Sequence, residues 1–252
     1  MKKLLIFLLV YIPLTAFAIS RSEAVELYKE GNALYEKGAY QEALGKYEAA
    51  ISGYRSFELY FNAGNCCVKL NRIPEAVIHY ERARKINPTD EDLLNNLSMA
   101  NLKLVDKIEH LPALGVETWW MAITAEGTLG RWTALTIIFT VIAFALLGIF
   151  IWYRTLRLRK MLAALGIVCL LLAAGTWILA SSAHRRIASN TEAIIKPERI
   201  DVRTSPSAEA VSSFVLHAGT KVVIRNVSGD WAEVKIANGN VGWMPFSDLV
   251  VI

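Results

Sequence analysis

Several catalytic motifs are absent from this sequence of 252 residues. It contains no Gly-rich phosphate loop of the Walker type, no H-E-x-x-H pair and no G-x-S-x-G turn, so the common signatures of nucleotidases, zinc proteases and serine hydrolases are missing. The four histidines are scattered along the chain, at His79, His110, His184 and His217. The sequence therefore predicts a non-enzymatic protein with no catalytic residue, no metal and no cofactor.

Cysteine is also scarce, with three residues and no C-x-x-C motif. Cys66 and Cys67 are adjacent, which raises the alternative of a thiol enzyme. Neighbouring residues on a helix point about 100° apart, so a bond between these two would strain the helix. Free cysteine behaves as a small hydrophobe. We therefore expect both thiols to be buried packing residues, and Cys169 to lie out of their reach.

An excess of basic over acidic residues is confined to two short clusters. The net charge of +4 reflects residues 154–160 together with Lys2 and Lys3, whereas regions 21–110 and 184–252 carry nearly equal numbers of acidic and basic residues. Neither long region therefore has the excess of positive charge that binding to nucleic acid requires. We expect no nucleic-acid partner.

The chain opens with the pattern of a secretory signal peptide. Residues 1–18, "MKKLLIFLLVYIPLTAFA", have two lysines, a short apolar core and a small-x-small end. We predict cleavage after Ala18, with an uncleaved anchor as the alternative. No cysteine follows the apolar core, so a lipoprotein signal is not expected.

Two later apolar runs, 132–153 and 161–180, contain no charged residue. Each is long enough to cross the ~30 Å of hydrocarbon in a bilayer, and the alternative is a buried helix pair in a soluble domain. The basic loop 154–160 between them predicts a cytoplasmic connection by the positive-inside rule. The sequence thus predicts an inner-membrane protein with two spans and a lipid environment, whose flanking domains face the periplasm or exterior.

The N-terminal half repeats itself. "GNALYEKGAYQEALGKYEAAI" (31–51) aligns with "GNCCVKLNRIPEAVIHYERAR" (64–84) at an offset of 33 residues. This period and its helix-turn-helix pattern resemble the tetratricopeptide repeat family. We predict an all-α repeat domain over 22–107, and its parts are units 24–56 and 57–90 and a capping helix 91–107. Because three repeats are usually needed for stability, we expect docking on a partner or on the rest of the chain to supply the missing burial.

The repeat resemblance implies a concave groove that binds a peptide or protein. Its asparagines either contact the partner or hydrogen-bond within the stack. A carboxylate clamp known in one subclass is not expected, because its basic positions fall here on Tyr28, Asp92 and Asn96. The residues that the resemblance places in the groove are Tyr28, Asn32, Tyr35, Phe61, Asn62, Asn65 and Lys69.

The segment 108–131 joins the repeats to the first apolar run. It contains Trp119 and Trp120 among small and apolar residues. It is either an interfacial helix on the outer leaflet or a packed loop.

Residues 190–252 consist of short β-like runs separated by turn residues, which predicts a small all-β barrel of about five strands. The region resembles bacterial SH3-like domains, which often bind cell-wall peptides. The resemblance rests on "DVRTSP", "LHAGTKV", "DWAEVKI" and "GNVGWM". Trp231, Trp243 and Phe246 are candidate ligand contacts, but such a small barrel needs large core residues, and we weigh the two tryptophans more heavily as core.

The order of these parts resembles the BatE family of membrane proteins from aerotolerance operons. The resemblance implies a non-enzymatic envelope scaffold that assembles with other Bat-type proteins, including von Willebrand A-type membrane proteins. It also implies a role in tolerance of oxygen or envelope stress. The alternative function is a cell-wall sensor or tether that binds peptidoglycan through the SH3-like domain.

Overall fold

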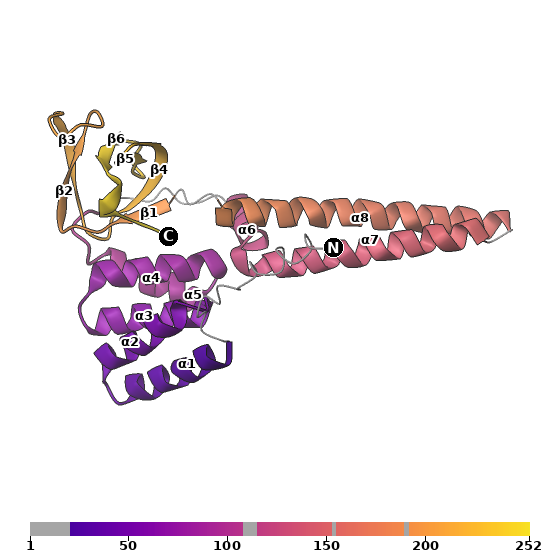
Figure 1. Cartoon of the computed structure of the whole chain (residues 1–252), viewed down its shortest axis with the longest axis horizontal. Coiled ribbons are helices and arrows are strands. Elements are labelled where there is room, and N and C mark those ends of the chain that lie inside the picture. The colour runs from indigo at the N-terminus through magenta and orange to yellow at the C-terminus, as the bar shows by residue number, and fades with distance from the viewer. Residues whose placement is uncertain (1–20, 108–114, 153–154, 189–191) are drawn as a thin grey trace, which may run out of the picture.

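The computed structural model describes residues 21–107, 115–152, 155–188 and 192–252. Figure 1 shows three parts: a stack of short helices, a β region beside it, and a long two-helix hairpin that projects away from both. The predicted signal peptide 1–18 lies outside the described residues.

Five helices form the stack, and their ends follow local sequence signals. Ser56 and Asp90 accept hydrogen bonds from the backbone N–H of Leu59 and Leu93, which caps the third and fifth helices. Gly38 and Asn71 take positive φ values of 77° and 59° in the turn within each unit. The helices are α1 (Arg21–Glu36), α2 (Tyr40–Ile51), α3 (Phe57–Lys69), α4 (Ile73–Ile86) and α5 (Glu91–Asn101).

In each unit, a glycine on the first helix packs against a tyrosine ring on the second helix. A Cβ on Gly31 would lie 2.6 Å from Cε1 of Tyr47, and one on Gly64 would lie 2.4 Å from Cε1 of Tyr80. No side chain fits at that separation, so the paired helices approach closely only because both positions are glycine. The period of 33 therefore repeats one packing contact.

Cys66 and Cys67 are fully buried free thiols in this stack. Burial raises the pKa of each thiol to about 12, so both stay protonated and unreactive at neutral pH. Their role in packing is confirmed.

The hairpin consists of α7 (Leu129–Trp152) and α8 (Leu156–Ala188), both long and apolar enough to cross a membrane. Most of their large apolar side chains are exposed, unlike those of a soluble core helix. The predicted basic loop 154–160 is wrong in its extent, because α8 starts at Leu156 and places Arg157, Arg159 and Lys160 in its first turns. Residues 154–160 contain no glycine or proline that would disfavour a helix at these positions.

A short helix, α6 (Gly115–Ile123), and the turn η1 (Glu126–Thr128) precede α7. The indole Nε1 of Trp132 donates to the carbonyl of Ile123 at 2.7 Å, which fixes the corner between α6 and α7. Val116, Trp119 and Trp120 are exposed on α6. Residues 115–123 are thus helical rather than a packed loop.

The β region is one antiparallel sheet in the order β3-β2-β6-β5-β4-β1-β7. It has seven strands rather than about five, because short pairings at β1 and β7 extend the sheet along the edge that docks on the stack. Ala232, Val234 and Met244 point into its core. The strands are β1 (Glu192–Ile195), β2 (Arg199–Arg203), β3 (Ser212–His217), β4 (Lys221–Ser228), β5 (Trp231–Lys235), β6 (Val241–Pro245) and β7 (Leu249–Val251).

The β region docks on the stack beside α4 (Figure 1). Ile194 and Ile252 belong to the apolar core of the helices, not to that of the sheet. The expectation that another part of the chain supplies the missing burial is confirmed.

A buried ion-pair network holds this junction. The carboxylate of Glu81 on α4 lies 3.0 Å from Nζ of Lys221 on β4 and 2.8 Å from the guanidinium of Arg84, and Lys221 also reaches Glu192 at 3.0 Å. Burial alone would raise the pKa of Glu81, but Lys221 and Arg84 outweigh it and lower the pKa. Glu81 is therefore charged at neutral pH.

Asp106, just after α5, holds the turn between β3 and β4. Its carboxylate accepts from the backbone N–H of His217 at 2.7 Å and from the hydroxyl of Thr220 at 2.7 Å, and it contacts Nδ1 of His217 at 2.8 Å. Burial would raise the pKa of Asp106, but the bonds from Thr220 and His217 lower it overall. Two independent polar anchors therefore fix the β region to the stack.

Candidate partner-binding surfaces

The helical stack has a hollow of about 400 Å³ between α3, α4 and α5. We call it the repeat groove. Of the predicted groove residues, Tyr35, Asn65 and Lys69 line it. The other lining residues are Val68, Ile73, Tyr80, Asn96, Met99, Ala100 and Lys103.

The asparagines connect successive first helices. Oδ1 of Asn32 accepts from the hydroxyl of Tyr47 at 2.7 Å and from Nδ2 of Asn62 at 3.2 Å. Oδ1 of Asn65 accepts in the same way from the hydroxyl of Tyr80 at 2.7 Å and from Nδ2 of Asn96 at 3.1 Å. The local hydrogen-bonding alternative therefore describes these side chains, which fix the spacing of α1, α3 and α5.

The remaining predicted groove residues pack against neighbouring rings. The ring of Tyr28 lies 6.2 Å from that of Tyr47. The ring of Phe61 stacks on Phe57 at 5.6 Å and lies 6.1 Å from Tyr80. Neither Tyr28 nor Phe61 lines the repeat groove, nor do Asn32 and Asn62.

The contribution of α5 to the groove was not predicted from the sequence, in which Asn96 was named only as a clamp position. At the offset of 33 the repeat alignment pairs Asn62 with Asn95, so Asn96 lies one residue beyond the position that the alignment gives. Met99 is 61% exposed at the groove, a large apolar side chain left open to a partner. Lys69 and Lys103 are exposed, and no acidic residue is among the described lining residues. The groove thus combines an apolar floor with positive charge.

A second surface lies on the outer face of the β region. Trp231 pairs with Pro245 across β5 and β6, and Trp243 pairs with Glu233 and Arg203 on the strands beside it. Since side chains alternate along a strand, Trp231, Trp243 and Pro245 share one face, opposite the buried core. We call these three residues the aromatic face.

The core role weighed for the two tryptophans is wrong. Small and medium residues fill the inner face instead, and a Cβ on Gly242 would lie only 2.6 Å from Cγ1 of Val202. Trp231 and Trp243 are half-buried, and Phe246, which follows the aromatic face in sequence, is 39% exposed. All three side chains are accessible to a ligand.

Metal ligation has no support in the described part of the chain. No group of three or more histidine, cysteine, aspartate or glutamate side chains is placed there to hold a metal ion.

Comparison with protein families matches residues 57–90 to the tetratricopeptide repeat. The matched segment contains α3 and α4, the helices on either side of the Gly64–Tyr80 contact. Comparison with curated proteins finds no match. A tetratricopeptide repeat indicates a protein–protein interaction scaffold, and so protein partners in general.

Proposed function

We propose that this protein is a non-enzymatic, membrane-anchored scaffold of the cell envelope that holds a partner protein in the repeat groove. The observation that carries the proposal is the open groove on a tetratricopeptide stack that is itself completed by the β region. The resemblance to the BatE family adds Bat-type partners, including von Willebrand A-type membrane proteins, and a role in aerotolerance.

The groove chemistry defines the partner segment. Val68, Ile73 and Met99 offer an apolar floor, while Lys69 and Lys103 supply two ammonium groups. A segment with an apolar side chain next to a carboxylate satisfies both, because the carboxylate gains charge-assisted hydrogen bonds from lysine. The partner thus presents a short acidic and apolar stretch.

The anchoring follows from α7 and α8. Arg157, Arg159 and Lys160 at the far end of the hairpin favour a cytoplasmic tip. Both ends of the hairpin that lead to the stack and to the β region then lie on the exterior side, next to each other (Figure 1). The SH3-like identity of the β region and its periplasmic position belong to this proposal.

The junction at Glu81 and Asp106 makes the stack and the β region one body. A partner held in the groove is therefore held at a fixed position relative to the β region. This is the geometry that a scaffold needs, because fixed placement raises the effective concentration of tethered partners.

Crosslinking and affinity purification of the full chain from detergent tests the proposal. A Lys69→Glu, Lys103→Glu double variant should lose the partner that the native chain recovers. The matched control is Lys37→Glu, an exposed lysine outside the groove. Equal recovery by the double variant and the control, or after deletion of residues 24–107, would remove the groove from the function.

The aromatic face favours a second function, binding of peptidoglycan as a cell-wall sensor or tether. Tryptophans with one accessible ring face stack on sugar rings and cover apolar peptide surface at low entropic cost. The full chain in detergent should sediment with peptidoglycan, and Trp243→Ala should abolish this. Trp119→Ala, which removes an exposed tryptophan elsewhere, is the control. Unchanged sedimentation of Trp243→Ala would end this alternative.

A further inference from the structure

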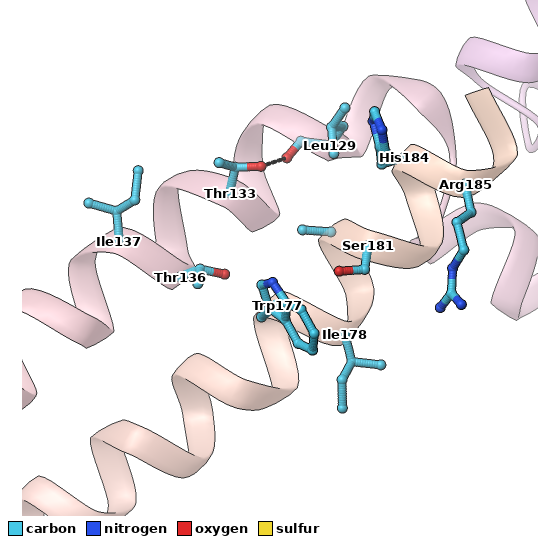
Figure 2. A pocket seen from close by; sticks show the side chains of 10 residues that line it. Leu129, Thr133, Thr136, Ile137, Trp177, Ile178, Ser181, His184 and Arg185 are labelled. Atoms are coloured by element: carbon cyan, nitrogen blue, oxygen red, sulfur yellow. Dashed lines mark hydrogen bonds between the residues drawn. The ribbon is translucent and has the colours of Figure 1, made fainter. Parts of the chain in front are cut away.

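The hairpin contains a hollow of about 720 Å³ at the end nearest the helical stack (Figure 2). We call it the hairpin hollow. Four of its lining residues come from α7 and six from α8, so it lies in the crease between the two helices. They are Leu129, Thr133, Thr136, Ile137, Trp177, Ile178, Ala180, Ser181, His184 and Arg185.

A hydrogen bond joins the two helices beside the hollow. The hydroxyl of Thr136 contacts that of Thr176 at 2.9 Å, which joins α7 to α8. One helical turn further toward the exterior, the small side chains of Ala180 and Ser181 face the hollow. Small residues there leave space that neither helix fills.

The lining is chemically divided along the helix axis. Ile137, Trp177 and Ile178 form an apolar end that lies deeper in the span, whereas His184 and Arg185 form the exterior end (Figure 2). None of the ten lining residues is acidic. Within the described residues, Arg185 is exposed and has no carboxylate partner at ion-pair distance. Its guanidinium is thus available to an anion.

We propose that the hairpin hollow binds one anionic phospholipid of the outer leaflet, with its phosphate on Arg185 and an acyl chain along Ile137, Trp177 and Ile178. This inference rests on the proposed membrane anchoring. Arginine matches phosphate with paired hydrogen bonds.

A partner helix fits the hollow less well than a lipid. Interfaces between spanning helices favour small residues that let backbones approach closely. Trp177 is 62% exposed at the hollow, and its ring keeps another backbone away. A flexible acyl chain follows such a surface without a close backbone approach.

Native mass spectrometry of the full chain in detergent, titrated with phosphatidylglycerol, measures this binding. Losing a charge-assisted contact of ~1.5 kcal/mol should make Arg185→Gln bind roughly tenfold more weakly. Ser181→Leu, which fills the hollow without changing charge, should have a similar effect. The control is Arg131→Gln, an exposed arginine near the same end that does not line the hollow.

Two further arms separate the outcomes. Glycerol phosphate, which lacks acyl chains, should not compete with the lipid; equal competition would make this an anion site and overturn the lipid proposal. Equal lipid binding by Arg185→Gln and Arg131→Gln would also overturn it. Alkaline carbonate extraction tests the membrane anchoring separately. Release of the native protein from membranes would contradict the proposed anchoring. If the Arg185→Gln variant stays in the membrane, its weaker lipid binding reports on the lipid site alone.

Discussion

The two repeat units share one packing scheme but differ in what covers their second helix. Lys46 and Glu48 on α2 correspond to His79 and Glu81 on α4 at the offset of 33. The side chains on α2 are 42% and 51% exposed, whereas those on α4 are 9% and 7% exposed. Position within a repeat therefore does not decide whether a polar residue is surface or interior. The exposure of such a side chain depends on what packs on its helix, and for Glu81 that neighbour is the β region.

The largest expected effect comes from removal of the buried carboxylate of Glu81. Glu81→Ala should lower the free energy of unfolding of the stack by about 4 kcal/mol, because it leaves Lys221 with one less partner in a buried site. Glu48→Ala should cost less than about 1 kcal/mol, since Glu48 is half exposed. Native-state hydrogen exchange in α4 of the full chain measures both. Equal costs would contradict the difference between the units.

The second test asks whether the glycine–tyrosine contacts of the two units contribute equally to stability. Gly31→Ala and Gly64→Ala each force a methyl group against a tyrosine ring and should each cost about 2 kcal/mol by overpacking. Thermal unfolding of the stack should show similar losses for the two variants. Gly45→Ala is the control, because nothing lies within 4 Å of a Cβ there. A much larger cost for one glycine would show that the shared packing scheme does not carry equal weight in both units.

The third test is pH dependence at His79. Burial, aided by Arg82 and Arg72, lowers the pKa of His79 to about 4, and Glu48, 3.9 Å from Nε2, and the ring of Tyr60 also face it. The unfolded chain binds a proton below pH ~6.5 that the folded stack does not bind, so stability falls as the pH falls from there toward 4. The expected loss is about 2 kcal/mol at pH 5.

His79→Phe should flatten this slope between pH 6.5 and 5, as followed by chemical denaturation at a series of pH values. The native chain should lose further stability below about pH 4.5, because Glu81 and Asp106 take up protons there in the unfolded chain, whereas their lowered pKa values keep them charged in the folded chain until the pH is lower. An unchanged slope between pH 6.5 and 5 in His79→Phe would contradict the lowered pKa of His79 as the cause of the acid sensitivity in that range.

The smallest test concerns the turns within the units. Gly38→Ala places a side chain at φ 77° and should cost about 1 kcal/mol, whereas Asn71→Gly at φ 59° should change stability by a few tenths. Comparison of their unfolding midpoints checks whether the two turns follow the same conformational rule. A larger loss for Asn71→Gly would mean that its side chain contributes beyond its backbone.

Local rules made much of this fold predictable. The offset of 33 aligned Gly31 with Gly64 and Tyr47 with Tyr80, which the structure brings into the same contact in each unit, and uninterrupted apolar runs located α7 and α8. The length of α8 was underestimated, because charge marks the edge of a membrane and not the end of a helix. His184 and Arg185 continue the helix beyond the predicted span 161–180.

The junction could not be predicted, because its contacts join residues far apart in the chain. Glu81 and Lys221 are separated by 140 residues, and each alone has the pattern of a solvated surface residue. The same limit applies to Trp231 and Trp243, which were weighed as core because a small barrel needs bulk. The inner face is filled by Met244, Val234 and residues like them, which alternation along β5 and β6 would have favoured over the tryptophans.

The docking of the β region on α4 has a consequence for the history of the chain. Tandem arrays lengthen by duplication of a unit, and each new unit needs a free helix face on which to stack. Here the face of α4 that a further second helix would cover is occupied by Ile194, Ile252 and the Glu81 network. A copy inserted after residue 90 would displace the β region and separate Asp106 from its turn. The array therefore cannot grow at this end without loss of the junction.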